Sequence, residues 1–527
     1  MRPLAILVTA LLVPAIPTAA PAAAGGWPLD CADGSARCAD VADSDDAFGH
    51  YVGHDEPALA FYSSRPDSGN RVRWRVTLPV EPTAVPPAAT RTFQLTPAFW
   101  FGMVLCDTQS YPLRVSTCAP ASDANITDLA RHPGGAFLEV QFYPPGWISL
   151  PFGLSCDASR WCAAVAVFSL ARDPVGDRNL NKACVKRLHG GVEPVNFAFV
   201  TKDGSPHAPP DPLNGSAGTT GTVNPQTDLL MNQGDALVVT IADSTGGVHV
   251  QIDDLTTHES GAMTASAANG FAQVVFAPKP SRDCRVIPYD FHPMYSTSSD
   301  QTRLPWGNHA MNVSFSAEIG HFQYCSRVSP RTGRCVGDER PGVRADRDNK
   351  RCVASPPAPL VAGCLDANTG FDGPSYQLDW PDGDTVTHPT PFVVQSPLTG
   401  PDWANGYERV AFETNLPTLE ALRGRKKFTR ASRKYCDILS GARCTLFPRT
   451  DRGTPAAFYP FFSLHAADGA CEWAIGDTIP GFTTSDFGKN AQFGTPVLVP
   501  HLFEGFRLVN EALIFRGTIF APCTPRP

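Results

Sequence analysis

The sequence predicts an all-β protein with a two-sheet sandwich and, after it, a smaller disulfide-stapled β-rich domain. The chain has 51 prolines and 44 glycines, and only 18% of its residues are charged. Such a chain is rich in turns and poor in the Glu, Lys and Ala runs that long helices need. Short stretches that alternate apolar and polar residues recur along it, which is the pattern of half-buried strands. The chain also has sixteen cysteines, an even number that can pair completely into disulfides, and this predicts the disulfide staples.

The alternating stretches in the first half of the chain are predicted as strands bounded by turn residues. They cover 72–78, 92–95, 99–105, 137–143, 162–168, 195–200, 236–241, 248–252 and 271–276. A loop at 207–227, rich in Pro, Gly, Ser and Thr, interrupts them, and its length suits a crossover between the two sheets of one sandwich. Residues 47–327 are therefore predicted to form one large sandwich domain.

A charged, proline-containing linker is predicted at 328–364, where acidic and basic residues crowd a segment with few apolar side chains. Residues 365–527 are predicted as the C-terminal β-rich domain. Its expected strands lie at 376–380, 392–395, 409–413, 457–462 and 513–520, with one short helix at 416–423.

The first residues predict export. Residues 1–24 combine a basic start, an apolar run too short to span a bilayer and small residues before Gly25, which is the pattern of a signal peptide. Residues 25–46 are predicted as an N-terminal disulfide-stapled segment. We expect a secreted, extracellular protein without a transmembrane segment, in which cysteines oxidise. The short-range pairs expected are Cys31–Cys38, Cys106–Cys118, Cys156–Cys162 and Cys436–Cys444.

Charge and motifs exclude several function classes. The net charge is −8, from 43 basic and 51 acidic residues, which argues against a nucleic-acid partner. The sequence has no G-x-S-x-G elbow, no H-E-x-x-H pair and no P-loop. No cofactor and no metal site is predicted. N-glycosylation sequons begin at Asn125, Asn214 and Asn312.

One strand carries the first candidate site. Glu139 and Gln141 are two residues apart on the stretch 137–143, so both side chains point to the same face. Tyr143 and Trp147 are then available to stack on sugar rings. The alternative is an ordinary solvated sheet face, because every amphipathic strand alternates in this way.

A histidine-rich stretch forms the second candidate site. His292, His309 and His321 fall within 30 residues of one another, and Glu318 lies close to the last of them. Imidazole beside a carboxylate can bind a ligand or transfer a proton. The spacing matches no metal motif, and histidine beside aromatic residues also serves as a hydrogen-bonded packing residue.

Several strings resemble a family of long secreted microbial proteins to which no activity is assigned. They are FLEVQFYPPGW at 137–147, EPVNFAFV at 193–200, LLMNQGDALVVTI at 229–241, SAANGFAQVVF at 266–276, PYDFHPMYSTSS at 288–299 and EIGHFQYC at 318–325. The resemblance covers most of the chain after residue 24. It implies secretion and leaves the activity open.

Two segments, 234–240 and 253–261, also resemble consecutive strands of the glutamic peptidases called eqolisins. That resemblance implies a concanavalin-like sandwich and a catalytic pair of one Gln and one Glu. The strand that should supply the Glu covers 269–276 and contains no acidic residue. The fold expectation is therefore a concanavalin-like or jelly-roll sandwich, and the peptidase chemistry stays an alternative.

The leading functional hypothesis is an extracellular protein that binds or cleaves polysaccharide. Extended sheets with a concave face of aromatic and carboxylate side chains commonly meet polysaccharide. Cleavage of a glycoside needs two carboxyl groups, so Glu139 is the candidate acid or base and Glu318 its candidate partner. An eqolisin-like endopeptidase and a non-enzymatic cell-surface or matrix protein are the alternatives, and whether the protein is an enzyme stays open.

Overall fold

The structure is a computed structural model that describes the strands and many of their connections. The described residues are 58–80, 91–92, 99–110, 118–123, 134–145, 156–173 without 158, 178–179, 181–275 without 192 and 217, 284–299, 302, 312–317, 323–324, 338–340, 343–344, 393–416, 462–467, 470–475, 483–485, 497–503 and 507–520. The predicted signal peptide at 1–24, the segment 25–46, the strand 376–380 and most of the helix 416–423 lie outside them.

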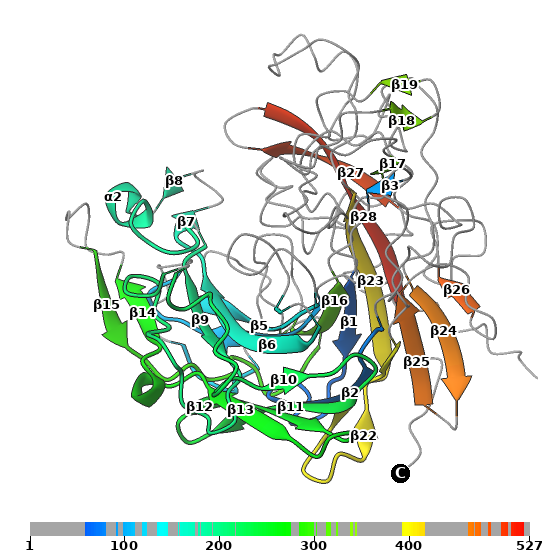
Figure 1. The fold of residues 1–527 in the computed structure, drawn as a ribbon, viewed down its shortest axis with the longest axis horizontal. Coiled ribbons are helices and arrows are strands. Elements are labelled where there is room, and N and C mark those ends of the chain that lie inside the picture. The colour runs from blue at the N-terminus through cyan, green and yellow to red at the C-terminus, as the bar shows by residue number, and fades with distance from the viewer. Residues whose placement is uncertain are drawn as a thin grey trace, which may run out of the picture.

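Two large antiparallel sheets make up the fold, which confirms the all-β prediction (Figure 1). The first sheet runs in the order β10 (Leu230–Met231), β6 (Trp161–Ser169), β5 (Gly135–Tyr143), β4 (Phe99–Cys106), β16 (Val313–Ala317), β1 (Ala58–Tyr62), β23 (Arg409–Leu416), β28 (Arg507–Phe520) and β27 (Val497–Phe503), and β9 (Val195–Phe199) also pairs with β6. The second runs in the order β13 (Ser260–Thr264), β12 (Gly247–Asp254), β11 (Ala236–Ser244), β2 (Arg71–Thr77), β20 (Val393–Gln395), β25 (Ala470–Ile475), β24 (Phe462–Ala467) and β26 (Thr483–Ser485), with β21 (Leu398–Thr399) and β22 (Asn405–Gly406) beside β2.

In the described part of the chain, short ribbons and two short helices accompany the sheets. The ribbons are β3 (Arg91–Thr92) with β17 (Gln323–Tyr324), β7 (Arg172–Asp173) with β8 (Arg178–Asn179), β14 (Ala272–Val275) with β15 (Arg285–Pro288), and β18 (Asp338–Arg340) with β19 (Val343–Arg344). The helices are α2 (Lys182–Val185) and the single turn η2 (Ala267–Asn269). None of the described helices is long and apolar enough to cross a membrane.

The core lies between the sheets, and alternation along each strand supplies it. In β2 the residues Val72, Trp74 and Val76 point inward, and the ring of Trp74 lies 4.7 Å from that of Phe101 in β4. Burial of one such side chain stabilises the fold by about 1.5–3 kcal/mol. The other face of β4 is buried as well, because Trp100 packs edge-on against Phe137 in a second apolar cluster. Figure 1 shows β5, β6 and β9 of the first sheet lying over β11, β12 and β13 of the second.

The loop at 207–227 does not cross between the sheets, so that prediction is wrong. β9 precedes the loop and β10 follows it, and both pair with β6. The chain passes to the second sheet at the turn between β10 and β11, where Asp235 accepts a 2.6 Å hydrogen bond from the backbone of Asn232 and Gly234 takes a positive φ of 81°. A tight turn therefore changes sheets where a long loop was expected.

The strands after residue 392 continue both sheets, which differs from the predicted division of the chain at 328–364. β1 pairs with β16 on one side and with β23 on the other. β2 likewise pairs with β11 and with β20. Without the later strands, one edge of β1 and one of β2 would leave backbone groups unpaired. In the described residues, the segments 47–327 and 365–527 thus share two sheets.

Disulfides staple the sandwich at three described places. Cys106–Cys118 and Cys156–Cys162 are formed as predicted. Cys184–Cys284, which the sequence did not indicate, ties α2 to the segment before β15. Cys471 is also disulfide-bonded, and none of the cysteines in the described part of the chain is free. The predicted pairs Cys31–Cys38 and Cys436–Cys444 lie outside the described residues.

Candidate functional site

Glu139 and Gln141 lie side by side on β5, on the face turned away from the second sheet. Gln141 Nε2 donates a 2.6 Å hydrogen bond to Oε2 of Glu139, and the hydroxyl of Tyr143 donates to Oε1 of Gln141. The shared face that strand periodicity predicted is therefore observed. Both Glu139 and Gln141 are half-buried, so their polar groups are fixed by one another and reach solvent only in part.

Tyr143 does not offer its ring to a sugar in this structure. Its side chain is buried, with 7% exposed, and its ring lies 6.3 Å from that of Phe197 in an apolar cluster that includes the disulfide of Cys156 and Cys162. The predicted stacking role of Tyr143 is corrected on this ground. Beside the polar pair, the outer face of the sheet is therefore apolar where Tyr143 packs with Phe197 and Phe199. Trp147 lies outside the described residues.

Of the three histidines in the predicted cluster, His292 is the one that lies among the described residues. His292 Nδ1 lies 2.8 Å from Oδ1 of Asp243, and the carbonyl of His292 accepts a hydrogen bond from the backbone of Cys106. His292 thus links the end of β11 to the end of β4 through these two hydrogen bonds. His309, His321 and Glu318 lie outside the described residues, and within those residues no group of three His, Cys, Asp or Glu side chains could hold a metal ion.

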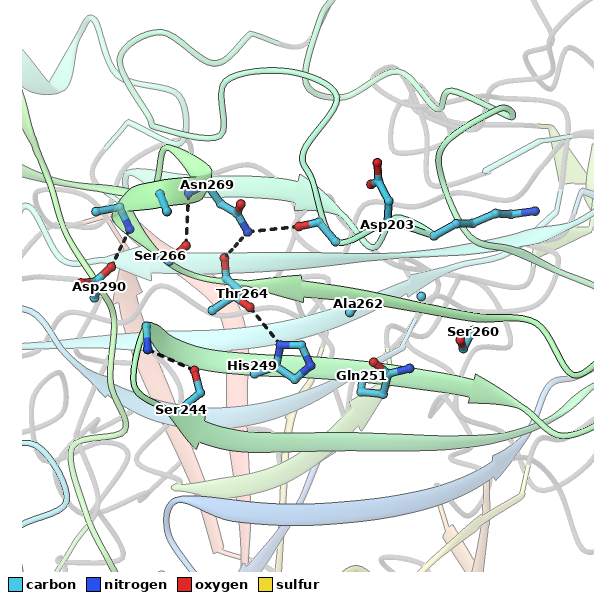
Figure 2. A pocket seen from close by; sticks show the side chains of 16 residues that line it. Asp203, Ser244, His249, Gln251, Ser260, Ala262, Thr264, Ser266, Asn269 and Asp290 are labelled. Atoms are coloured by element: carbon cyan, nitrogen blue, oxygen red, sulfur yellow. Dashed lines mark hydrogen bonds between the residues drawn. The ribbon is translucent and has the colours of Figure 1, made fainter.

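A polar groove that the sequence interpretation missed lies on the outer face of the second sheet, over β12 and β13 (Figure 2). Its volume is about 820 Å³. The side chains that line it carry ammonium, carboxylate, imidazole, amide and hydroxyl groups. They include Lys202, Asp203, His249, Gln251, Thr264, Asn269 and Asp290.

The floor of the groove follows from alternation along β12. Val248, Val250 and Ile252 point into the core, so His249 and Gln251 point outward. His249 Nδ1 lies 2.9 Å from the hydroxyl of Thr264 on β13. Gln251 Nε2 donates a 2.9 Å hydrogen bond to Asp253 on its own strand. The floor is thus a row of polar side chains on a rigid sheet, each held by a neighbour.

The wall of the groove is built from η2 and from the loop at 202–204. The amide of Asn269 donates to the carbonyls of Gly204 and Thr264, at 3.2 and 3.0 Å. Asp290 accepts a 2.7 Å hydrogen bond from the backbone of Ala267. These bonds tie three separate segments of the chain together, as Figure 2 shows. The wall is therefore held in place before any ligand arrives.

Asp107, the residue after β4, has a raised pKa, but it lies inside the sandwich and not in the groove. Burial raises the pKa of Asp107 to about 6, against the opposing effect of hydrogen bonds from the side chain of Ser169, the backbone of Gln109 and Ser110, and the side chain of Gln273. Gln273 Nε2 lies 2.8 Å from Oδ1 of Asp107. Asp107 has 0% of its surface exposed and Gln273 has 1%. Because no ligand reaches a fully enclosed carboxylate, the structure favours a structural role for this pair.

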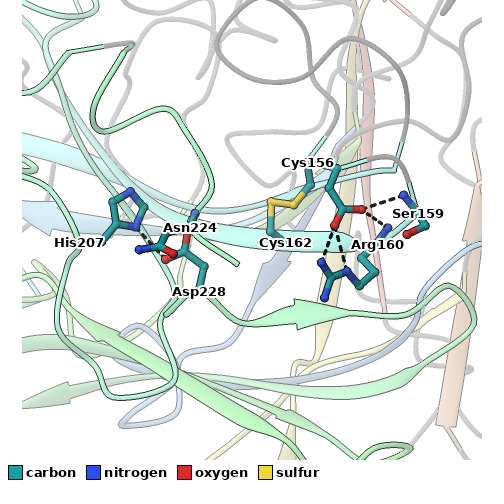
Figure 3. Close-up of a disulfide and its surroundings, with 8 residues drawn as sticks. Cys156, Ser159, Arg160, Cys162, His207, Asn224 and Asp228 are labelled. Atoms are coloured by element: carbon teal, nitrogen blue, oxygen red, sulfur yellow. Dashed lines mark hydrogen bonds and ion pairs between the residues drawn. A yellow bond between two sulfur atoms is a disulfide. The ribbon is translucent and has the colours of Figure 1, made fainter. Parts of the chain in front are cut away.

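A buried Asp and His pair fixes the loop that follows β9 (Figure 3). His207 Nδ1 lies 2.7 Å from Oδ1 of Asp228, and its ring stacks 5.6 Å from that of Phe199. Asp228 also accepts a 2.7 Å bond from the backbone of Asn224. Nε2 of His207 is buried and has no hydrogen-bond partner among the residues that the structure describes. The pair therefore lacks the hydroxyl or thiol nucleophile that would complete a catalytic triad.

Among these places, the groove over β12 and β13 is the accessible one with several kinds of polar group fixed around an open volume. The pair of Glu139 and Gln141 is the second candidate. Comparisons with known proteins found no relative of this chain. No family model matches it, and no similar curated protein or solved structure was found.

Proposed function

We propose that the chain is an extracellular glycan-binding protein whose ligand lies in the groove over β12 and β13. The observation that carries the proposal is the fixed row of polar side chains on the groove floor. His249 and Gln251 stand on a rigid sheet, and each is already positioned by a hydrogen bond. Sugars present many hydroxyl groups, which both donate and accept, so amide and imidazole groups suit them.

The size of the groove agrees with this ligand class. A volume of about 820 Å³ lies within the range of about 300–1,000 Å³ that small-ligand sites span. The lining mixes charged, amide, imidazole and hydroxyl groups with small apolar residues, whereas pockets that take hydrophobic molecules are mostly apolar. The apolar start of the sequence and the disulfides support an extracellular setting. Binding is proposed in preference to cleavage because glycoside hydrolysis needs two carboxyl groups placed about the scissile bond, whereas the groove floor presents an imidazole and an amide.

Isothermal titration calorimetry with a panel of soluble polysaccharides and their short oligomers tests the proposal. We expect one class to bind, and Gln251→Ala and His249→Ala each to weaken binding by about tenfold, which is the loss of one or two hydrogen bonds. Gln226→Ala is the matched control, because Gln226 is exposed and does not line the groove. Binding that survives both groove substitutions unchanged, or no binding by any polysaccharide, would overturn the proposal.

A second function has one observation in its favour. The hydrogen-bonded pair of Glu139 and Gln141 has the two residue types that the eqolisin resemblance implies for an endopeptidase. A carboxylate can take a proton from water, and an amide N–H can stabilise the oxyanion that forms when the water attacks a peptide carbonyl. Incubation with an unfolded protein substrate over an acid to neutral pH series tests this activity.

A further inference from the structure

Three arginines stand next to the groove on the outer face of the same sheet. Arg71, Arg73 and Arg75 alternate with the core residues of β2, so they point away from the core together. Residues two apart on an antiparallel strand are about 6.8 Å apart, since each residue adds about 3.4 Å. The sheet therefore carries a row of positive charges that runs along β2.

This row is close to the groove floor because one strand of small residues separates them. On β11, Thr240 pairs with Gln251 on one side and with Arg73 on the other. Ala242 pairs in the same way with His249 and with Arg71. The short side chains of Thr240 and Ala242 leave no barrier between the arginines and the floor. The groove and the arginine row thus form one continuous surface.

The middle arginine is held by an aromatic ring. The ring centre of Trp403 lies 4.1 Å from the guanidinium carbon of Arg73 and 5.4 Å from that of Arg71. Trp403 takes a positive φ of 60°, a backbone conformation that residues with side chains rarely adopt. The connection between β21 and β22 presents this ring, and β21 pairs with β2 at Arg73. The ring of Trp403 and the hydroxyl of Thr240 therefore hold the guanidinium of Arg73 in place.

The charges of the row are not neutralised by ion pairs. Among the residues that the structure describes, no carboxylate is within ion-pair distance of Arg71, Arg73 or Arg75. Nε of Arg73 donates to the hydroxyl of Thr240 at 3.2 Å. Burial lowers the pKa of Arg73, Asp253 opposes this, and the charges of the other two arginines add to the lowering. Three like charges in one row are costly, and an anion placed over them would relieve that cost.

We propose that the ligand of the groove is a uronic-acid polysaccharide, whose carboxylates bind the arginine row while its hydroxyls occupy the groove floor. This inference rests on the proposed glycan-binding function. A guanidinium forms two parallel hydrogen bonds with a planar carboxylate, and a guanidinium already held in place loses less freedom when it binds one. Asp203 and Asp290 stand on the opposite wall, so they repel carboxylates and orient the acidic edge of the ligand toward β2.

The test compares polygalacturonate and alginate with the same polymers after reduction of their carboxyl groups to alcohols. We expect the acidic forms to bind at least tenfold more tightly than the reduced forms, and the difference to shrink between 50 and 200 mM salt because salt screens charge pairs. Arg71→Gln with Arg73→Gln should remove most of this preference, and Trp403→Ala should reduce it. Arg187→Gln is the matched control, because Arg187 is exposed and lies outside the groove and the row.

The outcomes separate the two proposals. If the reduced and acidic polymers bind equally and Gln251→Ala weakens both, the glycan-binding function stands and the inference about uronic acids falls. If neither form binds, both fall. Tighter binding of dextran sulfate than of polygalacturonate would overturn the assignment to carboxylates, and binding of duplex DNA that depends on Arg73 would overturn the assignment to a polysaccharide.

Discussion

Gln273 donates a 2.8 Å hydrogen bond to Oδ1 of Asp107, and this bond joins β14 to the end of β4 inside the sandwich. Ser169 donates to the other carboxylate oxygen of Asp107, from the end of β6. Three separate segments therefore meet on one buried carboxyl group. An enclosed carboxylate of this kind makes stability depend on pH, because burial penalises its charged form.

We expect the stabilising contribution of Asp107 to fall as the pH rises. Its pKa is raised from 3.8 to about 6 in the folded state, so the folded protein binds the proton more tightly than the unfolded chain. The contribution is complete below about pH 4 and is lost as the pH passes through about 6. Two pKa units correspond to about 3 kcal/mol. Urea unfolding of wild type and Asp107→Asn at several pH values isolates this group, since the substitution removes its titration.

The free energy of unfolding of the wild type minus that of Asp107→Asn should decrease by about 2–3 kcal/mol between pH 4 and pH 7. Asp402→Asn is a suitable control, because Asp402 is an exposed aspartate. A difference that stays constant over this range would show that Asp107 titrates at an ordinary pH in the folded protein.

The disulfide Cys184–Cys284 should stabilise the fold more than Cys156–Cys162 does. The first closes a loop of 100 residues and the second a loop of 6. Loop-closure entropy predicts losses of about 4–5 and about 2 kcal/mol when each pair is replaced by serine. Thermal or urea unfolding of the two double variants measures both. Equal losses would indicate that the structure around Cys184 and Cys284 holds without the bond.

Glu139→Gln should abolish any hydrolytic activity, on protein or on polysaccharide, and should leave the fold intact. The change removes the ionisable group and keeps the side-chain volume, and its amide can still accept the bond from Gln141. Loss of a general acid or base lowers a rate by about 10²–10⁴-fold. Glu408→Gln is the matched control, because Glu408 is an exposed ion-pair partner of Arg65. Equal rates in the wild type and Glu139→Gln would remove this pair from the candidate sites.

The described sequons differ in accessibility, which predicts where sugar is attached in a host that glycosylates. Asn214 is exposed. Asn312 is fully buried, and its side chain bonds the carbonyl of Thr297 at 2.8 Å and the backbone of Val104 at 3.2 Å. We expect Asn214→Gln to lower the mass of the protein made in such a host by one glycan. Asn312→Gln should leave the mass unchanged and reduce stability, and mass spectrometry with a melting curve distinguishes the two.

The strands could be predicted from sequence because alternation is local. The spacing of Trp74 and Phe101 along their strands is enough to predict that both side chains lie in the core. The partner of a strand is not local information, so the sequence could not show that β1 lies between β16 and β23. Glu139 and Gln141 were found because both stand on one strand. The groove was missed because His249 and Asn269 meet only after β12, β13 and η2 pack together.

The place of β1 also determines when the fold can form. β1 near the start of the chain needs β23 beside it, and β23 in turn needs β28, which ends at Phe520. During synthesis or export from the N-terminus, the early strands leave the ribosome or the translocation channel long before their partners. Unpaired strand edges attract other chains, and contacts distant in sequence form slowly. We therefore expect chains truncated before residue 393 to aggregate, so that folding waits for the last strands to arrive.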